Sequence, residues 1–336
     1  MSIKPRAGII VPSRGGEEGL RRLFDALLPE LAGQEVEVLL ADDGSEKPLQ
    51  FFEKEYQGRL NLKVVRQDPL GPAAARNTGI KNSSSDILIF LDSDVTPLPG
   101  WFEAIITPLE RNPELAAVEG KTIASNLDSL DPFLHFVHNF DGGQYLTCNM
   151  AYRRSRVEAA QGFDERFKHP YREDSDLAFS VLEQGGRIVF EPAAVVDHPV
   201  RPVRLWRMFW LYPVRRGYNW LLFRRHPQMF REKVDPFTDK SELSFILSFA
   251  LAAAFFVLGW PWPGFAALIL HQAIYSHLLL RHLYFGGRKV NNLATPWKIF
   301  AKAYPFFWPA TFLSMAGIAW GWFRFLNVRP ANPEKP

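Results

Sequence analysis

Two carboxylates stand one residue apart at the end of a short apolar run, in the sequence Asp92-Ser93-Asp94 after Ile87 to Leu91. A run rich in β-branched and aromatic residues predicts a buried strand, and side chains at positions i and i+2 of an extended chain point to the same side. Two hard oxygen ligands facing one cavity suit Mg²⁺ or Mn²⁺, which often binds one or two carboxylates while substrate phosphates complete its coordination. A solvated turn is the alternative, because the residues up to Pro99-Gly100 also favour a turn.

A second acidic group, Glu173-Asp174-Ser175-Asp176, precedes a helical pattern that ends near Gly185. Acidic residues stabilise the first turn of a helix, which accounts for one of them. Three acids in four positions exceed that need, and a carboxylate beside a bound hydroxyl can serve as a general base. His198 follows a strand-like segment and adds an imidazole that could complete the metal site, although a lone histidine is more often structural.

The segments around these groups alternate between strand-like and helix-like patterns. They follow one another at 7–11, 18–31, 35–41, 48–56, 62–65, 71–80 and 87–91. This β-α-β-α order predicts an α/β fold with a mostly parallel sheet and helices on both faces. Ligands bind beyond the carboxyl ends of the strands in such sheets, so we expect Asp42, Asp43 and Asp92 to converge on one crevice.

The overall composition limits the class of protein. The chain has 336 residues, and its 39 Lys and Arg against 36 Asp and Glu argue against a protein that binds nucleic acid. Cys148 is the single cysteine, so no intramolecular disulfide can form and a reducing compartment is expected. The first residues, Met1 to Arg6, do not resemble a secretory signal, and we expect the polar front half to lie in the cytoplasm.

The last third of the chain is far more apolar. Leu243 to Trp260 carries no charge and has about the length of a membrane-spanning helix. Two further runs, 265–280 and 303–323, are weaker candidates, and an internal core hairpin is the alternative. The basic residues from Arg281 to Lys302 would then lie on the cytoplasmic side. The sequence therefore predicts two or three segments in an inner (cytoplasmic) membrane.

Upstream of these runs, Val203 to His226 interleaves Arg with Trp, Phe, Tyr and Leu. Such a pattern is typical of helices in the headgroup layer, where the rings are buried while the cations meet anionic lipid. An amphipathic helix packed on the soluble domain is the alternative. We expect an interfacial helix pair that is broken near Pro213. The expected boundaries are 1–202 for the α/β domain, 203–240 for the interfacial helices, 241–326 for the transmembrane helical region and 327–336 for a tail.

Seven short motifs stand in a fixed order between Ala7 and Pro202. They are Val11-Pro12-Ser13, Ala41 to Ser45, Gly71 to Gly79, Leu91 to Asp94, Cys148 to Arg154, Gly162 to Glu165 and Glu173 to Leu177. In order and spacing they resemble the motifs of the family-2 inverting glycosyltransferases of the GT-A fold. The resemblance implies a catalytic domain of that fold, a nucleotide-sugar donor and a divalent cation, Mg²⁺ or Mn²⁺.

The same resemblance implies roles for individual residues. Asp42 or Asp43 would contact the nucleotide base, and Arg76 would help to shape the nucleotide pocket. Asp92 would lie near the ribose, Asp94 would bind the cation, and Asp174 would be the catalytic base. The residues expected to bind the donor are thus Pro12, Asp42, Asp43, Arg76, Asp92 and Glu173, and the expected metal ligands are Asp92, Asp94 and His198. These roles suit a direct displacement, in which a cation neutralises the leaving diphosphate while a carboxylate takes the acceptor proton.

Two departures from the family pattern narrow the expected function. The loop from Pro12 to Gly16 lacks the aromatic residue and the Asn of many relatives, and the segment from Arg204 to Trp210 lacks the Gln-x-x-Arg-Trp element of processive synthases. We therefore expect a membrane-attached enzyme that transfers one sugar from a nucleotide donor, UDP-linked, to a lipid or glycan acceptor at the cytoplasmic membrane face.

Two alternatives remain. A sugar nucleotidyltransferase shares the sheet type, although it usually has a Gly-rich loop with Arg and Lys after the first strand. A non-catalytic membrane protein would only bind a nucleotide, with its acidic residues acting as caps and turn formers.

Overall fold

The structure is a computed structural model that describes residues 4–125, 134–202, 205–234, 240–289 and 297–331. The chain divides into two compact units. Unit 1 comprises residues 1–126, 136–200 and 330–336, and unit 2 comprises residues 127–135 and 201–329.

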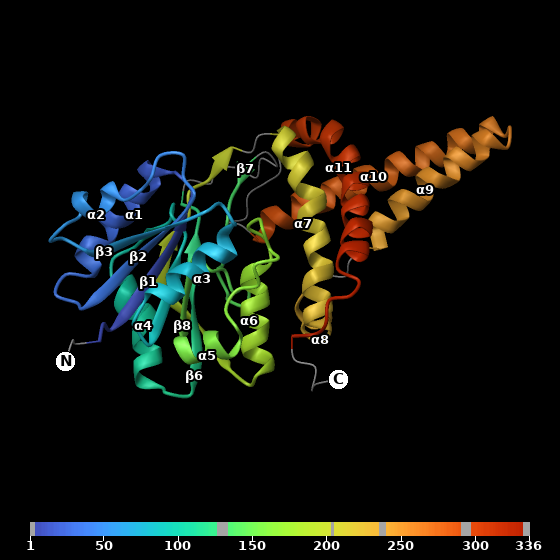
Figure 1. The fold of residues 1–336 in the computed structure, drawn as a ribbon. Helices are drawn as coiled ribbons and strands as arrows, with labels where there is room; N and C mark the ends of the chain where they lie inside the picture. The colour runs from blue at the N-terminus through green and yellow to red at the C-terminus, as the bar shows by residue number, and fades with distance from the viewer. Residues whose placement is uncertain (1–3, 126–133, 203–204, 235–239, 290–296, 332–336) are drawn as a thin grey trace. The chain divides into compact units, whose positions relative to one another are not determined.

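Unit 1 alternates strands and helices along the chain (Figure 1). Its first half consists of β1 (Ala7–Ser13), α1 (Glu17–Glu30), β2 (Val36–Asp43), α2 (Phe51–Glu55), β3 (Asn61–Gln67), α3 (Pro72–Asn82) and β4 (Ile87–Leu91). Its second half consists of β5 (Thr96–Pro97), α4 (Trp101–Arg111), β6 (Leu115–Ile123), β8 (Asn149–Arg153), α5 (Arg154–Ala159), α6 (Glu173–Glu183) and β9 (Arg187–Asp197). The seven elements predicted between residues 7 and 91 are confirmed, with small shifts at their ends.

These strands form one sheet in the order β3-β2-β1-β4-β8-β6-β9-β5. The pairs β1-β2, β2-β3, β1-β4 and β6-β9 are parallel, whereas β8 runs antiparallel to both β4 and β6, and β5 runs antiparallel to β9. The prediction of a mostly parallel α/β sheet is therefore confirmed. The carboxyl ends of β1, β2, β3 and β4 meet at one edge of this sheet.

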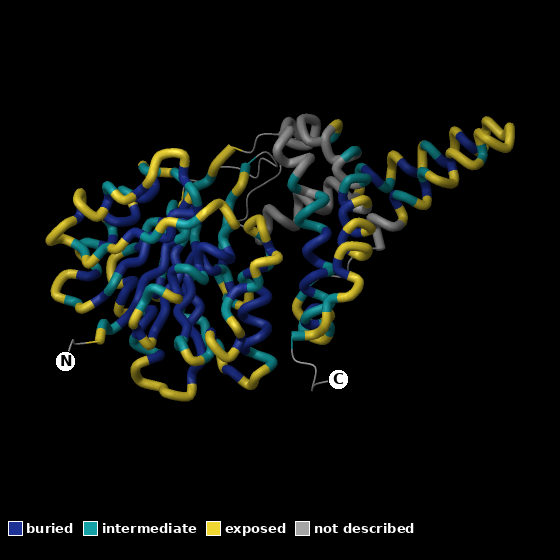
Figure 2. The backbone as a smooth tube through the Cα atoms, viewed as in Figure 1, coloured by how far each residue is buried: buried dark blue, intermediate teal, exposed yellow. Residues whose placement is uncertain are grey.

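The sheet has an apolar core on each face, because successive residues of a strand point to opposite sides. Ile9 of β1 packs in a cluster with side chains of α1, α2 and α4, whereas Ile10 packs in a second cluster with side chains of α3, α5 and α6. Figure 2 shows the central strands as mostly buried, whereas β3 and β9 are largely intermediate or exposed. Burial on both faces explains the nearly continuous apolar sequence of β4.

Unit 2 is mainly helical. It contains the short strand pair β7 (Leu134–His135) and β10 (Arg201–Pro202), and the helices α7 (Leu205–Arg225), α8 (Pro227–Lys233), α9 (Lys240–Val257), α10 (Pro261–Lys289) and α11 (Trp297–Arg324). Between α9 and α10, Gly259 adopts a φ of 75° and Pro261 occupies the first position of the next helix, where it needs no amide hydrogen. The chain therefore turns at residues 258–260, and the Pro-rich segment that follows forms the start of α10.

The break predicted near Pro213 is wrong, because α7 continues through this residue. The tertiary packing explains the difference. Gly317 of α11 lies directly against the backbone of Pro213, and Gly321 lies against Gly217. Glycines let two helix backbones approach closely, and this contact supports the helix where proline removes a hydrogen bond.

No helix among the residues that the structure describes is both long enough and apolar enough to cross a membrane. The transmembrane region expected at 241–326, now seen as α9, α10 and α11, is therefore not supported.

Candidate active site

Asp92 and Asp94 lie in the turn directly after β4, where the sheet places its carboxyl edge. Helix α1 packs against this turn at Gly19. A Cβ atom at position 19 would stand 2.9 Å from the carbonyl oxygen of Ser93 and 3.4 Å from the Cα of Asp94. The absence of a side chain at Gly19 therefore allows the helix to fix the path of the turn.

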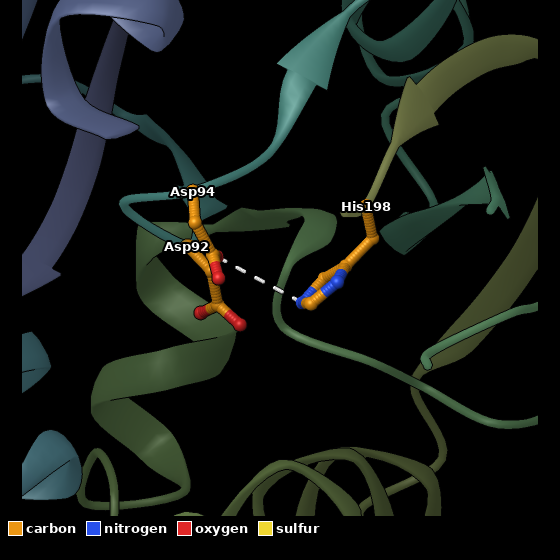
Figure 3. Close-up of side chains that lie close together, drawn as sticks. All are labelled: Asp92, Asp94 and His198. Carbon is orange, nitrogen blue, oxygen red and sulfur yellow. Dashed lines mark ion pairs between the residues drawn. The ribbon is translucent and has the colours of Figure 1, made fainter. Parts of the chain in front are cut away.

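His198 reaches the same place from the end of β9, which lies next to the edge strand β5. Strand β5 pairs with β9 so that Thr96 lies opposite Asp197, which brings the residue after β9 beside the turn before β5. His198 Nε2 lies 3.8 Å from Asp94 Oδ1, and Figure 3 shows Asp92, Asp94 and His198 pointing toward one another.

These three side chains could hold a metal ion. Each offers one ligand atom, and the three ligand atoms lie within 4.8 Å of one another. Two carboxylate oxygens and one imidazole nitrogen, in a partly buried position, fit Mn²⁺ or another divalent cation of similar chemistry. The structure thus brings together all three metal ligands expected from the sequence.

Arg76 of α3 connects this turn with the second acidic group. Its Nη2 donates to Asp92 Oδ1 at 2.8 Å, and its Nη1 donates to Glu173 Oε1 at 3.0 Å. The Arg76 side chain is 4% exposed, and its guanidinium lies 5.5 Å from the ring centre of Phe163. Because a buried cation is costly without anionic partners, the two carboxylates and Arg76 depend on one another.

Asp174 follows Glu173 in the first turn of α6. Burial, and then the negative charge of Glu173, raise the pKa of Asp174 to about 7, although its hydrogen bond from the Ser175 amide and the charges of Arg76 and Arg172 oppose this. A carboxylate with a pKa near neutrality is well matched to accept a proton from a hydroxyl group.

The backbone at the start of α6 is strained. Arg172, the residue before the helix, adopts a φ of 75° and a ψ of −10°, in the left-handed region that disfavours residues with a Cβ. Glu173 Oε2 accepts a hydrogen bond from the Tyr171 amide at 2.7 Å, which bridges the strained residue. Strain of this kind is concentrated at functional sites.

Asp42 and Asp43, at the end of β2, are buried and engaged in internal hydrogen bonds. Asp42 accepts from the amides of Ser45 and Leu49 and from Arg66 Nη1 at 2.7 Å. Although burial alone raises it, the hydrogen bonds from these three residues hold the pKa of Asp42 below its usual value.

Asp43 has a similar set of partners. It accepts from the Gln67 side chain and from the amides of Leu70 and Gly71, at 2.8 to 2.9 Å. A carboxylate has about four acceptor positions, so Asp43 keeps about one for a ligand, whereas the Ser45 side chain is a fourth donor to Asp42, which is fully buried. Their contact with a nucleotide base stays a prediction.

Pro12 lies in β1, next to Ser13, whose hydroxyl donates to the carbonyl of Gly15 at 2.7 Å. The Gly15 amide donates to Ser45 Oγ at 2.8 Å, so the first loop is tied to the loop after Asp42. Among the described contacts, nothing links Pro12, Asp42 or Asp43 directly to the cluster of Arg76, Asp92, Asp94, Glu173 and His198.

Sequence reasoning missed two residues that shape the site, Gly19 and Arg172. Neither gives a local signal, because the role of Gly19 depends on contact with a turn far along the chain and the backbone angle of Arg172 is not encoded by its residue type. Sequence reasoning also assigned no role to Asn149, which belongs to one of the seven motifs. Asn149 joins three elements, accepting from Trp101 Nε1 at 2.8 Å and donating to the carbonyls of Lys121 and Ala194.

Comparisons with known proteins agree with this architecture. The family model described as "Glycosyl transferase family 2" matches residues 8–154. A pre-mycofactocin glycosyltransferase of Mycobacterium tuberculosis is 30% identical over 57% of this chain and 42% of that protein, so the chain spans about four tenths of that relative's length. The glycosyltransferase AglE of Haloferax volcanii is 30% identical over 60% of this chain and 69% of that protein.

A solved structure shares the fold. The mannosyltransferase PcManGT from Pyrobaculum calidifontis, solved in complex with GDP-Man and Mn²⁺, aligns with 95% of this chain and 88% of that chain. The TM-score is 0.54 and the sequence identity is 16%. At this identity the likeness supports the GT-A-like α/β fold alone.

Proposed function

This chain belongs to glycosyl transferase family 2, and we propose that it is an inverting, cation-dependent glycosyltransferase that moves one sugar from a nucleotide-sugar donor to an acceptor hydroxyl. The proposal rests on one observation, that Arg76 donates hydrogen bonds to both acidic groups. One group, Asp92 with Asp94 and His198, is suited to a cation, and the other contains Asp174, whose pKa is about 7.

Asp92, Asp94 and His198 would hold the cation, which supplies positive charge against the leaving diphosphate. The buried Arg76 keeps Asp92 in place through a hydrogen bond, and Gly19 lets α1 fix the turn that carries both aspartates. These residues orient the donor side of the reaction.

Asp174 would take the proton of the acceptor hydroxyl. Its raised pKa makes the carboxylate a stronger base than an exposed aspartate, and it still loses its own proton near neutral pH. In a direct displacement the hydroxyl attacks the anomeric carbon as the nucleoside diphosphate leaves from the opposite face. One such step inverts the configuration at that carbon.

The donor, acceptor and location are finer parts of the proposal. We expect a UDP-linked sugar as the donor, and a lipid or glycan acceptor at the cytoplasmic face of the inner membrane. The basic and aromatic composition of residues 203–226 supports an acceptor held near lipid. The missing Gln-x-x-Arg-Trp element supports one transfer per acceptor in place of polymer synthesis.

A panel of nucleotide sugars, assayed for donor hydrolysis with and without Mn²⁺ or Mg²⁺, tests the enzyme class, cation and donor together. We expect hydrolysis of at least one donor to need the cation and to be lost in Asp94→Ala and in Asp174→Asn. Asp86→Asn is a matched control, because Asp86 is an exposed aspartate paired with Lys4. Full turnover in both site variants would reject the mechanism.

The products separate the rival functions. A glycosyltransferase releases a nucleoside diphosphate, whereas a sugar nucleotidyltransferase working from a nucleoside triphosphate releases pyrophosphate. Calorimetric binding of a donor with no turnover under any condition would indicate a protein that only binds the nucleotide.

A further inference from the structure

Most of the large apolar side chains that are exposed in the described part of the chain lie on the hairpin of α9 and α10. Ten of these fifteen side chains lie between Leu247 and Leu270. Val257 is 87% exposed and Trp262 is 81% exposed, at the turn between the two helices. Figure 2 shows exposed residues along this hairpin up to its tip. Surfaces of this kind mark a site for an apolar partner.

The central part of the hairpin, from Ser244 to His277, is also free of formal charge. No Asp, Glu, Lys or Arg occurs in this range. Its polar side chains find partners within unit 2. Ser248 Oγ donates to the carbonyl of Phe245 at 2.8 Å and lies 3.0 Å from His271 Nδ1, and Tyr304 donates to Gln272 Oε1 at 2.7 Å. Internal satisfaction of polar groups is what an element surrounded by hydrocarbon requires.

The charge of the surrounding chain identifies the partner. Residues 201–336 contain 18 Lys and Arg against 5 Asp and Glu, a net charge of +13, whereas residues 1–200 contain 21 against 31, a net charge of −10. A second copy of such a cationic segment would repel the first. A surface that combines hydrocarbon with negative charge would attract it on both counts.

We propose that the tip of the α9–α10 hairpin inserts into one leaflet of an anionic lipid bilayer, and that the cationic remainder of unit 2 binds the headgroups. The hairpin then enters from one side, without crossing the bilayer. This inference deepens the membrane part of the proposed function, on which it rests for its biological meaning, but its test does not depend on sugar transfer.

Flotation of the full-length protein with vesicles tests the inference. The test compares vesicles of phosphatidylcholine alone with vesicles of phosphatidylcholine and phosphatidylglycerol at a ratio of about 3:1. We expect the parent protein to float with the anionic vesicles, and its binding to weaken with added salt. The double variant Val257→Asp/Trp262→Asp should bind at least about tenfold more weakly, because charged residues are excluded from hydrocarbon.

Matched substitutions keep the test specific. Val257→Leu/Trp262→Phe retains the apolar surface and should float like the parent. Both positions are exposed and, among the described contacts, Trp262 makes only a ring contact with Phe265, so we expect neither variant to unfold, and circular dichroism checks this. Flotation of the Asp variant equal to that of the parent would overturn the proposal. So would a parent that never floats, or one that forms a dimer by light scattering which the Asp variant converts to a monomer.

A fluorescent label at the tip gives an independent reading. Cys148 is buried, so a cysteine introduced by Leu258→Cys can be labelled selectively with an environment-sensitive dye. Anionic vesicles should shift its emission to the blue, whereas the same dye at Glu114→Cys, on the exposed surface of unit 1, should not shift. An unshifted tip label would refute insertion. If every protein tested floats normally but none hydrolyses a donor, the proposed chemistry is rejected. The membrane role of the hairpin is not affected by that result.

Discussion

The two aspartate pairs at the carboxyl edge of the sheet resemble each other in sequence and differ in structure. Asp42 and Asp43 end β2, and Asp92 and Asp94 follow β4. The first pair is surrounded by hydrogen-bond donors, mostly backbone amides of nearby loops. In the second pair the two carboxylates lie close to each other and to the imidazole of His198, and Asp92 accepts one side-chain hydrogen bond, from Arg76. The hydrogen-bond donors around a carboxylate therefore indicate, more than its position after a strand, whether it stabilises a loop or can bind a cation.

The largest expected effect concerns the second pair. Asp94→Ala should lower cation-dependent donor hydrolysis by roughly 1,000-fold, because it removes a ligand for the charge that stabilises the leaving diphosphate. Its free energy of unfolding should change by less than about 0.5 kcal/mol, because the substitution removes a negative charge next to Asp92. Steady-state kinetics and urea denaturation measure the two quantities. Strong destabilisation by Asp94→Ala would show that Asp94 supports the fold as Asp43 does, and would contradict the difference between the two pairs.

The next effect concerns the arginine that the second pair relies on. Arg76→Met should lower the free energy of unfolding by about 3 to 5 kcal/mol, because it leaves Asp92 and the buried Glu173 without their cation. Urea denaturation measures the loss. Arg22→Met is the control, because Arg22 forms an exposed pair with Glu18 on α1, and removal of such a pair should have little effect. A loss below about 1 kcal/mol for Arg76→Met would show that the buried cluster is not mutually dependent.

The first pair should show the opposite pattern to Asp94. Asp43→Ala should lower the free energy of unfolding by about 1 to 3 kcal/mol, because the amides of Leu70 and Gly71 lose their acceptor. The donor KM should rise with little change in kcat, since the loops that Asp43 holds contribute to binding more than to chemistry. Asp68→Ala, at an exposed position in the same loop, is the control. A large fall in kcat would place Asp43 among the reacting groups.

The smallest effect is the dependence on pH. Asp174 acts as a base only without its proton, and its pKa of about 7 is raised above the ordinary value, so activity should rise as pH increases through 7. At saturating cation, kcat/KM for the donor should increase by about tenfold between pH 6 and pH 8. Glu173→Gln should move this rise to lower pH, because the charge of Glu173 helps to raise the pKa of Asp174. A flat profile in the parent enzyme would contradict the assignment of the base.

The fold of unit 1 was predictable because its signals are local. The apolar run of β4 and the helical spacing of α1 each depend on a few neighbouring residues, and both were confirmed. The grouping of Asp94 with His198 was only a hypothesis from sequence, since it depends on the pairing of Thr96 with Asp197 across the sheet. The role of Arg76 as a bridge was missed for the same reason, because Asp92 and Glu173 belong to distant segments.

Unit 2 was harder to predict. The rule that proline ends a helix failed at Pro213, because the packing of Gly317 against that turn is a long-range contact. Apolar composition alone predicted membrane spans at 241–326, but composition does not determine whether an uncharged helix crosses a bilayer or only enters it. The exposure of Val257 and Trp262 and the internal partners of Ser248 are properties of the packed hairpin.

Gly19 has a consequence for how this protein tolerates change. Any side chain there would push against the carbonyl of Ser93, which is backbone and cannot turn aside. In a survey of all single substitutions scored by activity, position 19 should therefore be as intolerant as a residue that touches the donor. Substitutions at position 19 would be harmful because any side chain would occupy space that the turn after β4 needs.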